Sequence, residues 1–402
     1  MTMTPKKHVL IIDGFPPPHF WLLQKGYRIT WLISVDRIRD RKGYTRIIGM
    51  SLDASRDEWV NIAKAIHDID PFDCILNFSE LHQDKTALIA KTLNLKWHRL
   101  DVIEVVNNKL KMREKINQSG IHSFRYKQIN NAEMLFELLE EWKTSIILKP
   151  KDSFGSQGIY EIHNINDARY AWESFTKLNY TDALAEELLV GEEYSVEAFS
   201  ENGKHHIVGI TNKFKNKKFV EIGHSFPALI DSNTEKVIMD YTQKILTILG
   251  VEDGVTHTEI IVTSTGPVIV ETHLRLGGDY IPDLVKESIG IDLVDTWMSS
   301  IVADRKFNHK PLKKEKKYAA VWFKENDLKG EVKDVGNVDN AKNIKGVLKV
   351  ELMKNIGDLV DSTSDSSSRL CLALAVANSP ESAISIAKQA VNEIKFDIVQ
   401  KD

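Results

Sequence analysis

The fold of this chain is decided by the stretch Thr258-Glu-Ile-Ile-Val-Thr-Ser-Thr-Gly-Pro-Val-Ile-Val-Glu271, which continues as Thr-His-Leu-Arg275-Leu-Gly-Gly-Asp279. Two runs of β-branched residues flank a short segment that contains a glycine, and this pattern predicts a β-hairpin. A turn centred on Thr265 places Glu259 across from Glu271 and His257 across from His273. Directly opposed residues share one face of a sheet, with Cβ atoms ~4.5–5.5 Å apart. We therefore expect two carboxylates to lie side by side.

Opposed carboxylates repel each other unless a positive charge lies between them. A divalent cation removes the repulsion, and carboxylate oxygens together with substrate phosphates are the usual ligands of Mg²⁺. The rival interpretation is a zinc site made of His257, His273 and one glutamate. A third interpretation places both glutamates on a hydrated face of the sheet. We favour magnesium, because lysines and a glycine-containing loop elsewhere in the chain indicate phosphate.

The phosphate signals are Lys109, Lys149 and the polar loop that follows Lys149. This loop reads Pro-Lys-Asp-Ser-Phe-Gly155-Ser-Gln-Gly158. A loop of this kind can fold its peptide N–H groups over an anion and form an anion-binding nest. Further along, an apolar connector with free backbone groups at 187–189 suits a purine edge, with Glu193 near the ribose. The basic run 213–218 is expected to be a solvated loop.

Composition limits the class of protein. The 402 residues exceed one ordinary core, so two or three domains are expected. The net charge of -4 provides no basic surface for nucleic acid. Two cysteines and the absence of a long apolar run indicate a soluble, cytoplasmic protein without a membrane partner. No Gly-x-Gly occurs, which excludes the dinucleotide-binding turn, and the Walker A pattern is also absent.

The hydrophobic pattern predicts α/β and α+β architecture in three parts. Residues 1–105 alternate strands and helices as in a parallel sheet, with strands at 8–12, 28–34 and 74–78 and helices beginning at the capping box of Ser55 and near Glu80. Residues 106–189 read as a compact α+β unit. Residues 190–402 read as largely antiparallel strands, with a helix that begins at a second capping box, Ser232-Asn-Thr-Glu235, and closes at Gly250, and with a strand-rich end from about 317.

The order of these motifs resembles the ATP-grasp superfamily, and most closely its carboxylate–amine ligases of the L-amino acid ligase type. The matching motifs are Asn108-Lys109, Leu148-Lys149-Pro, Gly155-Ser-Gln-Gly158, Glu186-Glu-Leu-Leu, Gly191-Glu-Glu193, Gly223-His224-x-x-Pro227, Glu259 and Glu271-x-His-x-Arg275-x-Gly-Gly. The resemblance implies an ATP-grasp fold with an N-terminal pre-grasp domain, a central lid and a strand-rich C-terminal domain.

The resemblance also implies a role for individual residues. Residues expected at ATP are Lys109, Lys149, Ser153, Gly155, Ser156, Gln157, Gly158, Glu186, Glu187, Leu188, Leu189 and Glu193. Glu259 and Glu271 are expected to carry Mg²⁺, with Mn²⁺ as the alternative. The family usually has asparagine where this chain has His273, and imidazole is a poorer Mg²⁺ ligand than an amide oxygen, so the role of His273 stays open. Arg275 and His224 are expected at the transferred phosphate and the acyl substrate, with Gly277, Gly278 and Asp279 at the substrate. For Asp279, a helix N-cap before Tyr280 is the alternative.

The expected activity is ATP-dependent formation of an amide between a carboxylate, such as an L-amino acid, and an amine through an acyl phosphate. One alternative transfers the acyl group to a carrier-protein thiol, and another carboxylates an acceptor in the manner of biotin carboxylase. A non-catalytic ATP-binding regulator is a third. Small molecules are the expected partners, and a homodimer is an expected assembly for this type of ligase.

Overall fold

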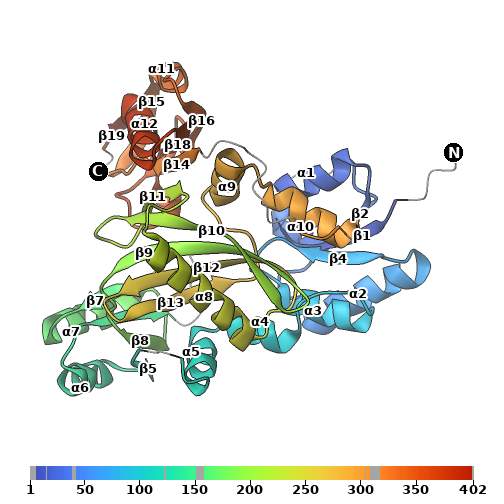
Figure 1. The fold of residues 1–402 in the computed structure, drawn as a ribbon, viewed down its shortest axis with the longest axis horizontal. Coiled ribbons are helices and arrows are strands. Elements are labelled where there is room, and N and C mark those ends of the chain that lie inside the picture. Colours follow the sequence, from blue (N-terminus) through green and yellow to red (C-terminus); the bar gives the residue numbers. More distant parts are fainter. Residues whose placement is uncertain are drawn as a thin grey trace.

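The computed structural model of the protein describes residues 6–14, 16–38, 42–121, 124–150, 158–303, 305–307 and 317–400. Within these ranges the strands form four sheets, one parallel and three antiparallel. Figure 1 shows the parallel sheet at one end of the molecule and the small sheet with α6 and α7 at the other. The predicted α/β and α+β fold class is confirmed.

The N-terminal sheet has the strand order β3-β2-β1-β4 and is parallel throughout. Its strands and helices are β1 (His8–Ile12), α1 (Pro16–Gln24), β2 (Arg28–Ser34), β3 (Arg46–Met50), α2 (Arg56–Ile69), β4 (Cys74–Asn77) and α3 (Gln83–Thr92), with the 3₁₀ turn η1 (Val35–Arg37) after β2. The capping box at the start of α2 is confirmed, because the Ser55 hydroxyl accepts from the Glu58 N–H and the Glu58 carboxylate accepts from the Ser55 N–H.

Two expectations in this part need correction. Strand β3 was not predicted, because Arg46-Ile-Ile-Gly-Met is too short for a clear alternation. The helix expected to start near Glu80 begins at Gln83. Glu80 therefore lies in the loop beyond the carboxyl end of β4.

A second unit carries a four-stranded antiparallel sheet in the order β5-β8-β6-β7. Its elements are β5 (Tyr126–Ile129), α6 (Ala132–Trp142), β6 (Ile146–Pro150), β7 (Tyr160–Ile162), α7 (Ile165–Lys177) and β8 (Ala183–Glu187). Helices α4 (Leu100–Val106) and α5 (Lys109–Gln118) lead into it from the N-terminal sheet.

The largest sheet has eight antiparallel strands in the order β13-β12-β9-β10-β11-β14-β18-β16. Its first half contains β9 (Glu192–Glu201), β10 (Lys204–Lys215), β11 (Glu221–Phe226), α8 (Ser232–Leu249), β12 (Gly254–Thr263), β13 (Gly266–His273), α9 (Ile281–Ile289) and α10 (Leu293–Val302). Helix α8 ends at Gly250 as predicted, but its N-cap is Asp231 and not Ser232, because the Asp231 carboxylate accepts from two N–H groups of the first turn.

The C-terminal part completes this sheet and adds the three-stranded sheet β17-β15-β19. Its elements are β14 (Tyr318–Phe323), β15 (Gly330–Gly336), α11 (Val338–Lys342), β16 (Val347–Leu352), β17 (Leu359–Val360), the 3₁₀ turn η2 (Ser366–Ser368), β18 (Cys371–Ala377), α12 (Pro380–Glu393) and β19 (Lys395–Val399). Helix α12 packs on β14 and β18.

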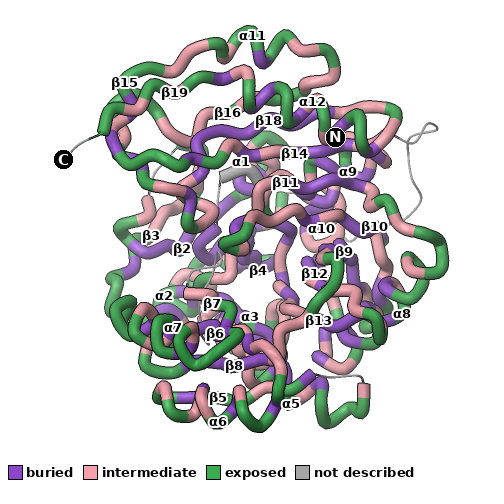
Figure 2. Tube along the Cα trace, turned by 90° about the vertical axis from the view of Figure 1, so that its left-hand side faces the viewer, coloured by how far each residue is buried: buried purple, intermediate pink, exposed green. Residues whose placement is uncertain are grey.

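One apolar core joins the N-terminal sheet to the large sheet. It includes Ile11 and Trp31 from the parallel sheet, Trp297 from α10, and Val321 and Leu374 from β14 and β18. Figure 2 shows that buried residues follow the strands and that exposed residues follow the outer helices and loops. None of the helices in the described ranges is both long and apolar enough to cross a lipid bilayer.

Candidate active site

The hairpin β12–β13 brings the two predicted carboxylates together. Glu259 pairs with Glu271 and His257 with His273, as the sequence predicted. The turn consists of Ser264 and Thr265, so its centre lies between these two residues and not on Thr265 as predicted. The strand pairs nearest to the turn are therefore shifted by one residue from the predicted register. A β-bulge between Glu259 and Ile260 restores the predicted register at the glutamate pair.

Each carboxylate of this pair faces a lysine. Lys213 Nζ lies 2.6 Å from Glu259, and Lys109 Nζ lies 2.9 Å from Glu271. Burial acts to raise the pKa of both glutamates, but the lysines and neighbouring histidines hold each pKa well below its usual value. Both side chains are therefore ionised at neutral pH.

Lys213 corrects an expectation about the basic run. It is not in a solvated loop, because it belongs to β10 and its side chain is buried. Its ammonium also lies 2.6 Å from Glu221 and 3.2 Å from Glu193. Lys213 thus forms ion pairs with three carboxylates at this site.

The residues at the hairpin fit a hard divalent cation. Ligand atoms of Glu259, Glu271 and His273 all lie within 4.8 Å of one another. The expected zinc alternative fits less well, because carboxylates face both ring nitrogens of His257: Glu197 lies 2.7 Å from Nδ1 and Glu259 lies 3.4 Å from Nε2. Burial acts to lower the pKa of His257, yet these carboxylates raise it to about 9, so the ring would have to lose a proton before it could coordinate zinc.

Glu80 is a site residue that the sequence analysis missed. Its carboxylate accepts from Arg275, whose Nε lies 2.6 Å away, and lies 3.0 Å from His273 Nδ1. Burial acts to raise its pKa, but His273 and Arg275 lower it to about 2. Its position beyond the carboxyl end of a parallel strand was the available signal, since ligands bind at that edge of such sheets.

Lys149 lies in a buried ion cluster with Glu186. The Lys149 ammonium contacts one Glu186 oxygen, and Arg113 Nε lies 2.7 Å from the other. The expectation for Glu186 was a direct place in the adenine site. Its carboxylate pairs with Lys149 and Arg113, which ties the start of the predicted adenine segment to both cations.

The segment after β8 also differs from the expectation of free backbone groups. The Glu187 N–H donates to the Arg125 carbonyl and the Leu188 N–H to the Ser145 carbonyl, both at 2.9 Å. Glu193, expected at the ribose, accepts from Lys215 at 2.6 Å. Within the residues that the structure describes, the Leu189 backbone forms no hydrogen bond to another backbone group.

Most of the predicted phosphate loop, including Ser153, Gly155, Ser156 and Gln157, lies outside the described residues. Gly158 is described and has a φ of +73°, a left-handed conformation that favours glycine.

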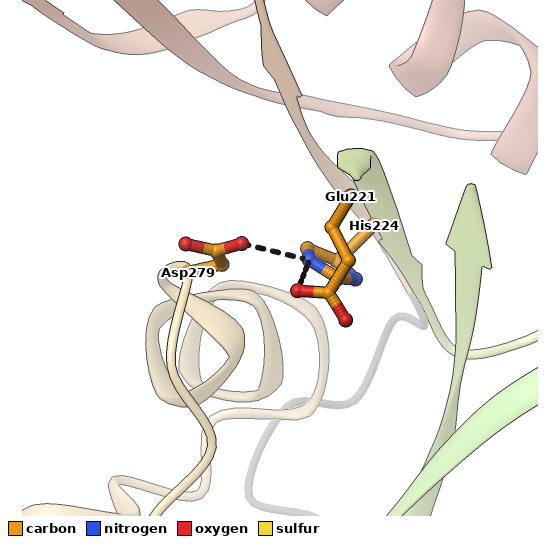
Figure 3. Close-up of side chains that lie close together, drawn as sticks. All are labelled: Glu221, His224 and Asp279. Atoms are coloured by element: carbon orange, nitrogen blue, oxygen red, sulfur yellow. Dashed lines mark hydrogen bonds and ion pairs between the residues drawn. The ribbon is translucent and has the colours of Figure 1, made fainter. Parts of the chain in front are cut away.

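Two carboxylates, Asp279 and Glu221, lie beside His224 (Figure 3). His224 Nε2 lies 3.3 Å from Asp279 and 3.8 Å from Glu221. The alternative assignment of Asp279 as a helix N-cap is wrong, because Tyr280 precedes α9 and no side chain caps it. Asp279 instead accepts two hydrogen bonds from Arg369, a residue that the sequence analysis did not select.

These groups surround one cavity of about 200 Å³. It lies where the N-terminal sheet, the small sheet and the large sheet meet. The predicted residues in its lining are Lys109, Lys149, His224, Glu259, Glu271, His273, Arg275, Gly278 and Asp279. Gly277 lies behind the lining, where a Cβ would come within 2.9 Å of His257 Nδ1.

Comparisons with known proteins identify two domains in the chain. Residues 142–283 match the ATP-grasp domain, and residues 327–399 match the L-amino acid ligase C-terminal domain 2. The alanine–anticapsin ligase of Bacillus subtilis (strain 168) is 28% identical over 249 residues, which are 55% of this chain and 52% of that protein. The chain thus matches about half the length of this relative.

Two solved structures share the fold. The L-amino acid ligase from Bacillus licheniformis superposes with a TM-score of 0.85 at 19% identity, over 99% of this chain and 100% of that one. The biotin carboxylase domain of the Hydrogenobacter thermophilus 2-oxoglutarate carboxylase, solved with MgADP, ADP and bicarbonate, has a TM-score of 0.72 at 14% identity, over 99% and 92%. Residues 142–283 of the chain therefore match the ATP-grasp domain, residues 327–399 match the C-terminal domain 2 of the L-amino acid ligases, and the whole chain shares the fold of a solved L-amino acid ligase.

Proposed function

We propose that this protein is an ATP-dependent ligase that joins a carboxylate, such as an L-amino acid, to an amine. The carboxylate oxygen attacks the γ-phosphorus of ATP, the bond to ADP breaks, and an acyl phosphate forms. The amine nitrogen then attacks the acyl carbon, phosphate leaves with the electrons of the C–O bond, and the nitrogen loses a proton. The products are an amide, ADP and phosphate.

The observation that carries this proposal is the pairing of Glu259 with Glu271 above a cavity that also contains Lys109 and Arg275. Phosphoryl transfer needs positioning and charge neutralisation more than covalent catalysis. The L-amino acid ligase C-terminal domain at residues 327–399 supports an amino acid as the carboxylate.

ATP-grasp ligases use ATP together with a divalent metal, and we propose Mg²⁺, with Mn²⁺ as the alternative. Glu259 and Glu271 would hold it, and the position of His273 suits a third ligand once the ring gives up its proton. Bound there, the ion would neutralise the charge on the phosphates.

The chain's own cations would do the remaining work on the phosphates. Burial lowers the pKa of Lys149, and Glu186, which Arg113 holds from its other oxygen, fixes where the Lys149 ammonium points. Lys109 enters the cavity from the start of α5, held by Glu271. We propose that both lysines bind phosphate oxygens as point charges.

We propose that Arg275 stabilises the transferred phosphoryl group or the oxyanion that forms on the acyl carbon. Glu80 and the Leu276 carbonyl hold three of its five N–H groups, so its guanidinium is fixed before substrate arrives. His224 borders the same cavity and would contact the acyl substrate. The segment 186–189 with Glu193 would form the adenosine end of the site, and the loop from 153 to 158 would cover the phosphates.

The test is a phosphate-release screen with ATP, Mg²⁺ and the twenty amino acids, singly and in pairs, followed by mass spectrometry of the products. We expect ADP, phosphate and a dipeptide from at least one pair. Release of AMP and pyrophosphate would contradict the acyl-phosphate route. A thioester on an added carrier protein or a carboxylated acceptor would favour the alternative acceptors. We further propose that the protein is a cytoplasmic homodimer. Gel filtration with light scattering measures the mass of the particle and so tests whether it is a dimer.

A further inference from the structure

A cation from the C-terminal part of the chain reaches the substrate end of the cavity. Arg369 follows η2, and its two terminal nitrogens donate to both oxygens of Asp279, at 2.7 and 2.8 Å. This two-bond geometry between guanidinium and carboxylate is the strong, directional form of an ion pair. Asp279 itself borders the cavity, whereas Arg369 lies behind it.

Arg369 is held rigidly where it stands. Only 3% of the residue is exposed, and its guanidinium lies 3.7 Å from the ring centre of Phe323. Its remaining contacts are to backbone carbonyls, from Nε to Ser366 at 2.8 Å and from Nη1 to Glu221 at 3.1 Å. These contacts join β11, β14, η2 and the start of α9, so Arg369 fixes Asp279 relative to several elements.

The fixed carboxylate in turn orients His224. Burial acts to raise the pKa of Asp279, but His224 and Arg369 lower it, so Asp279 is ionised and only accepts hydrogen bonds. The hydrogen on the His224 side of this contact must therefore be on Nε2. Figure 3 shows the ring between Asp279 and Glu221, with Nε2 toward both carboxylates.

We propose that Arg369 is a positioning and specificity residue, which orients His224 through Asp279 and, from behind the cavity wall, neutralises the charge that Asp279 would otherwise present to a cationic substrate side chain. The proposal rests on the proposed ligase function for its kinetic consequences. Because Arg369 neutralises Asp279, the wild-type site prefers a substrate side chain without positive charge. Removing Arg369 leaves the Asp279 carboxylate at the cavity wall without its cationic partner, which favours a lysine-like or arginine-like substrate.

The kinetic test compares Arg369→Ala, Arg369→Lys and the control Arg169→Ala. Arg169 also lies over an aromatic ring, that of Phe136, but it is exposed on α7 and does not line the cavity.

We expect Arg369→Ala to lower kcat/KM for an uncharged amino acid pair by ~10-fold or more, as losing an orienting partner typically does. Added guanidinium ion should restore part of this loss, and the preference for cationic over uncharged substrates should rise by ~10-fold. Adding Asp279→Asn to Arg369→Ala should abolish both the rescue and the new preference.

A spectroscopic test does not depend on turnover. In protein labelled with ¹⁵N-histidine, the signal of His224, assigned by its loss in His224→Gln, should report hydrogen on Nε2. It should shift in Arg369→Ala and in Asp279→Asn, and stay unchanged in Arg169→Ala.

Two outcomes overturn the proposal. One is a folded Arg369→Ala protein with an unchanged His224 signal. The other is a loss of activity without guanidinium rescue and without altered substrate preference, which would indicate a structural role alone. If the wild-type protein releases no phosphate with any pair, the proposed function fails, and the His224 signal still decides whether Arg369 positions this residue.

Discussion

At the scale of single residues, neighbouring opposite charges keep the acidic and basic side chains of this site ionised. Lys213 is buried, and burial acts to lower its pKa, but three surrounding carboxylates raise the pKa well above its usual value. Lys109 balances Glu271 in the same way from the other side. A dication with phosphate ligands would enter a cluster whose carboxylates are already ionised and oriented.

Glu271→Ala tests the metal assignment at this scale. We expect kcat to fall by at least ~10²-fold, because a charge-stabilising group is lost at the reacting phosphate. Steady-state phosphate release measures the effect, with Thr265→Ala in the turn of the same hairpin as the control. Near-normal turnover of Glu271→Ala would refute its role as a ligand.

Strands place the site residues through register and close packing. The bulge at Glu259 is an example, because continuation of the turn register would pair Glu259 with Val270 and move Glu271 to the other face. Strand β11, which carries Glu221 and His224, depends on a glycine. Gly223 pairs with Trp322 of β14, and a Cβ at Gly223 would lie 2.3 Å from the indole ring.

Gly223→Ala should therefore displace β11 and destabilise the protein by about 1–3 kcal/mol, the usual cost of overpacking. Urea unfolding measures the loss, and the KM for the carboxylate substrate should rise with it. Gly336→Ala is the matched control, because a Cβ there meets no atom within 4 Å. Restored stability in Gly223→Ala/Trp322→Leu would identify the indole as the cause.

The N-terminal sheet should lose stability in acid through His19. This residue of α1 packs against Trp31 and Phe78, and burial lowers its pKa from 6.5 to about 4. The neutral ring is the form that the fold favours, so its contribution is complete above pH 6.5 and is lost as pH falls from 6.5 to 4. The full effect is about 3 kcal/mol, at 1.36 kcal/mol for each pKa unit.

Unfolding free energies measured between pH 4 and 7 test this. His19→Phe should flatten the pH dependence relative to wild type, whereas His163→Asn, at an exposed position, should leave it unchanged. An equal slope in wild type and His19→Phe would assign the acid sensitivity to other groups.

At the scale of the whole molecule, the cavity joins parts that are distant in sequence. Glu80 comes from the N-terminal sheet, Lys149 from the small sheet, Glu271 from the large sheet, and Arg369 reaches Asp279 from the C-terminal part. A ligand that contacts several of these parts stabilises them together, by an amount set by its concentration relative to Kd.

ATP with Mg²⁺ should thus raise the unfolding midpoint. At a ligand concentration 100-fold above Kd the gain is about 2.7 kcal/mol. Differential scanning fluorimetry with and without EDTA measures the part due to the metal. The double variant Glu259→Gln/Glu271→Gln should keep its fold and lose the Mg²⁺-dependent part. An unchanged Mg²⁺ response in this variant would place the metal elsewhere.

Much of the architecture could be predicted from local pattern. Strands β1 and β2 occupy the predicted residues, and the pairing of Glu259 with Glu271 follows from alternation and a short turn. The start of α3 and the N-cap of α8 were missed by one to three residues. Helix ends depend on which neighbouring side chain captures the first N–H groups, and several candidates adjoined each end.

The sequence alone determined which residue types face one another across the hairpin, because the strand period and the turn are local properties of the chain. Only the tertiary structure decided that Glu80 holds Arg275, that Glu186 holds Lys149, and that Arg369 holds Asp279. Each of these pairs joins segments far apart in the chain, and their approach depends on how whole sheets and helices pack. No local pattern encodes a contact of that range.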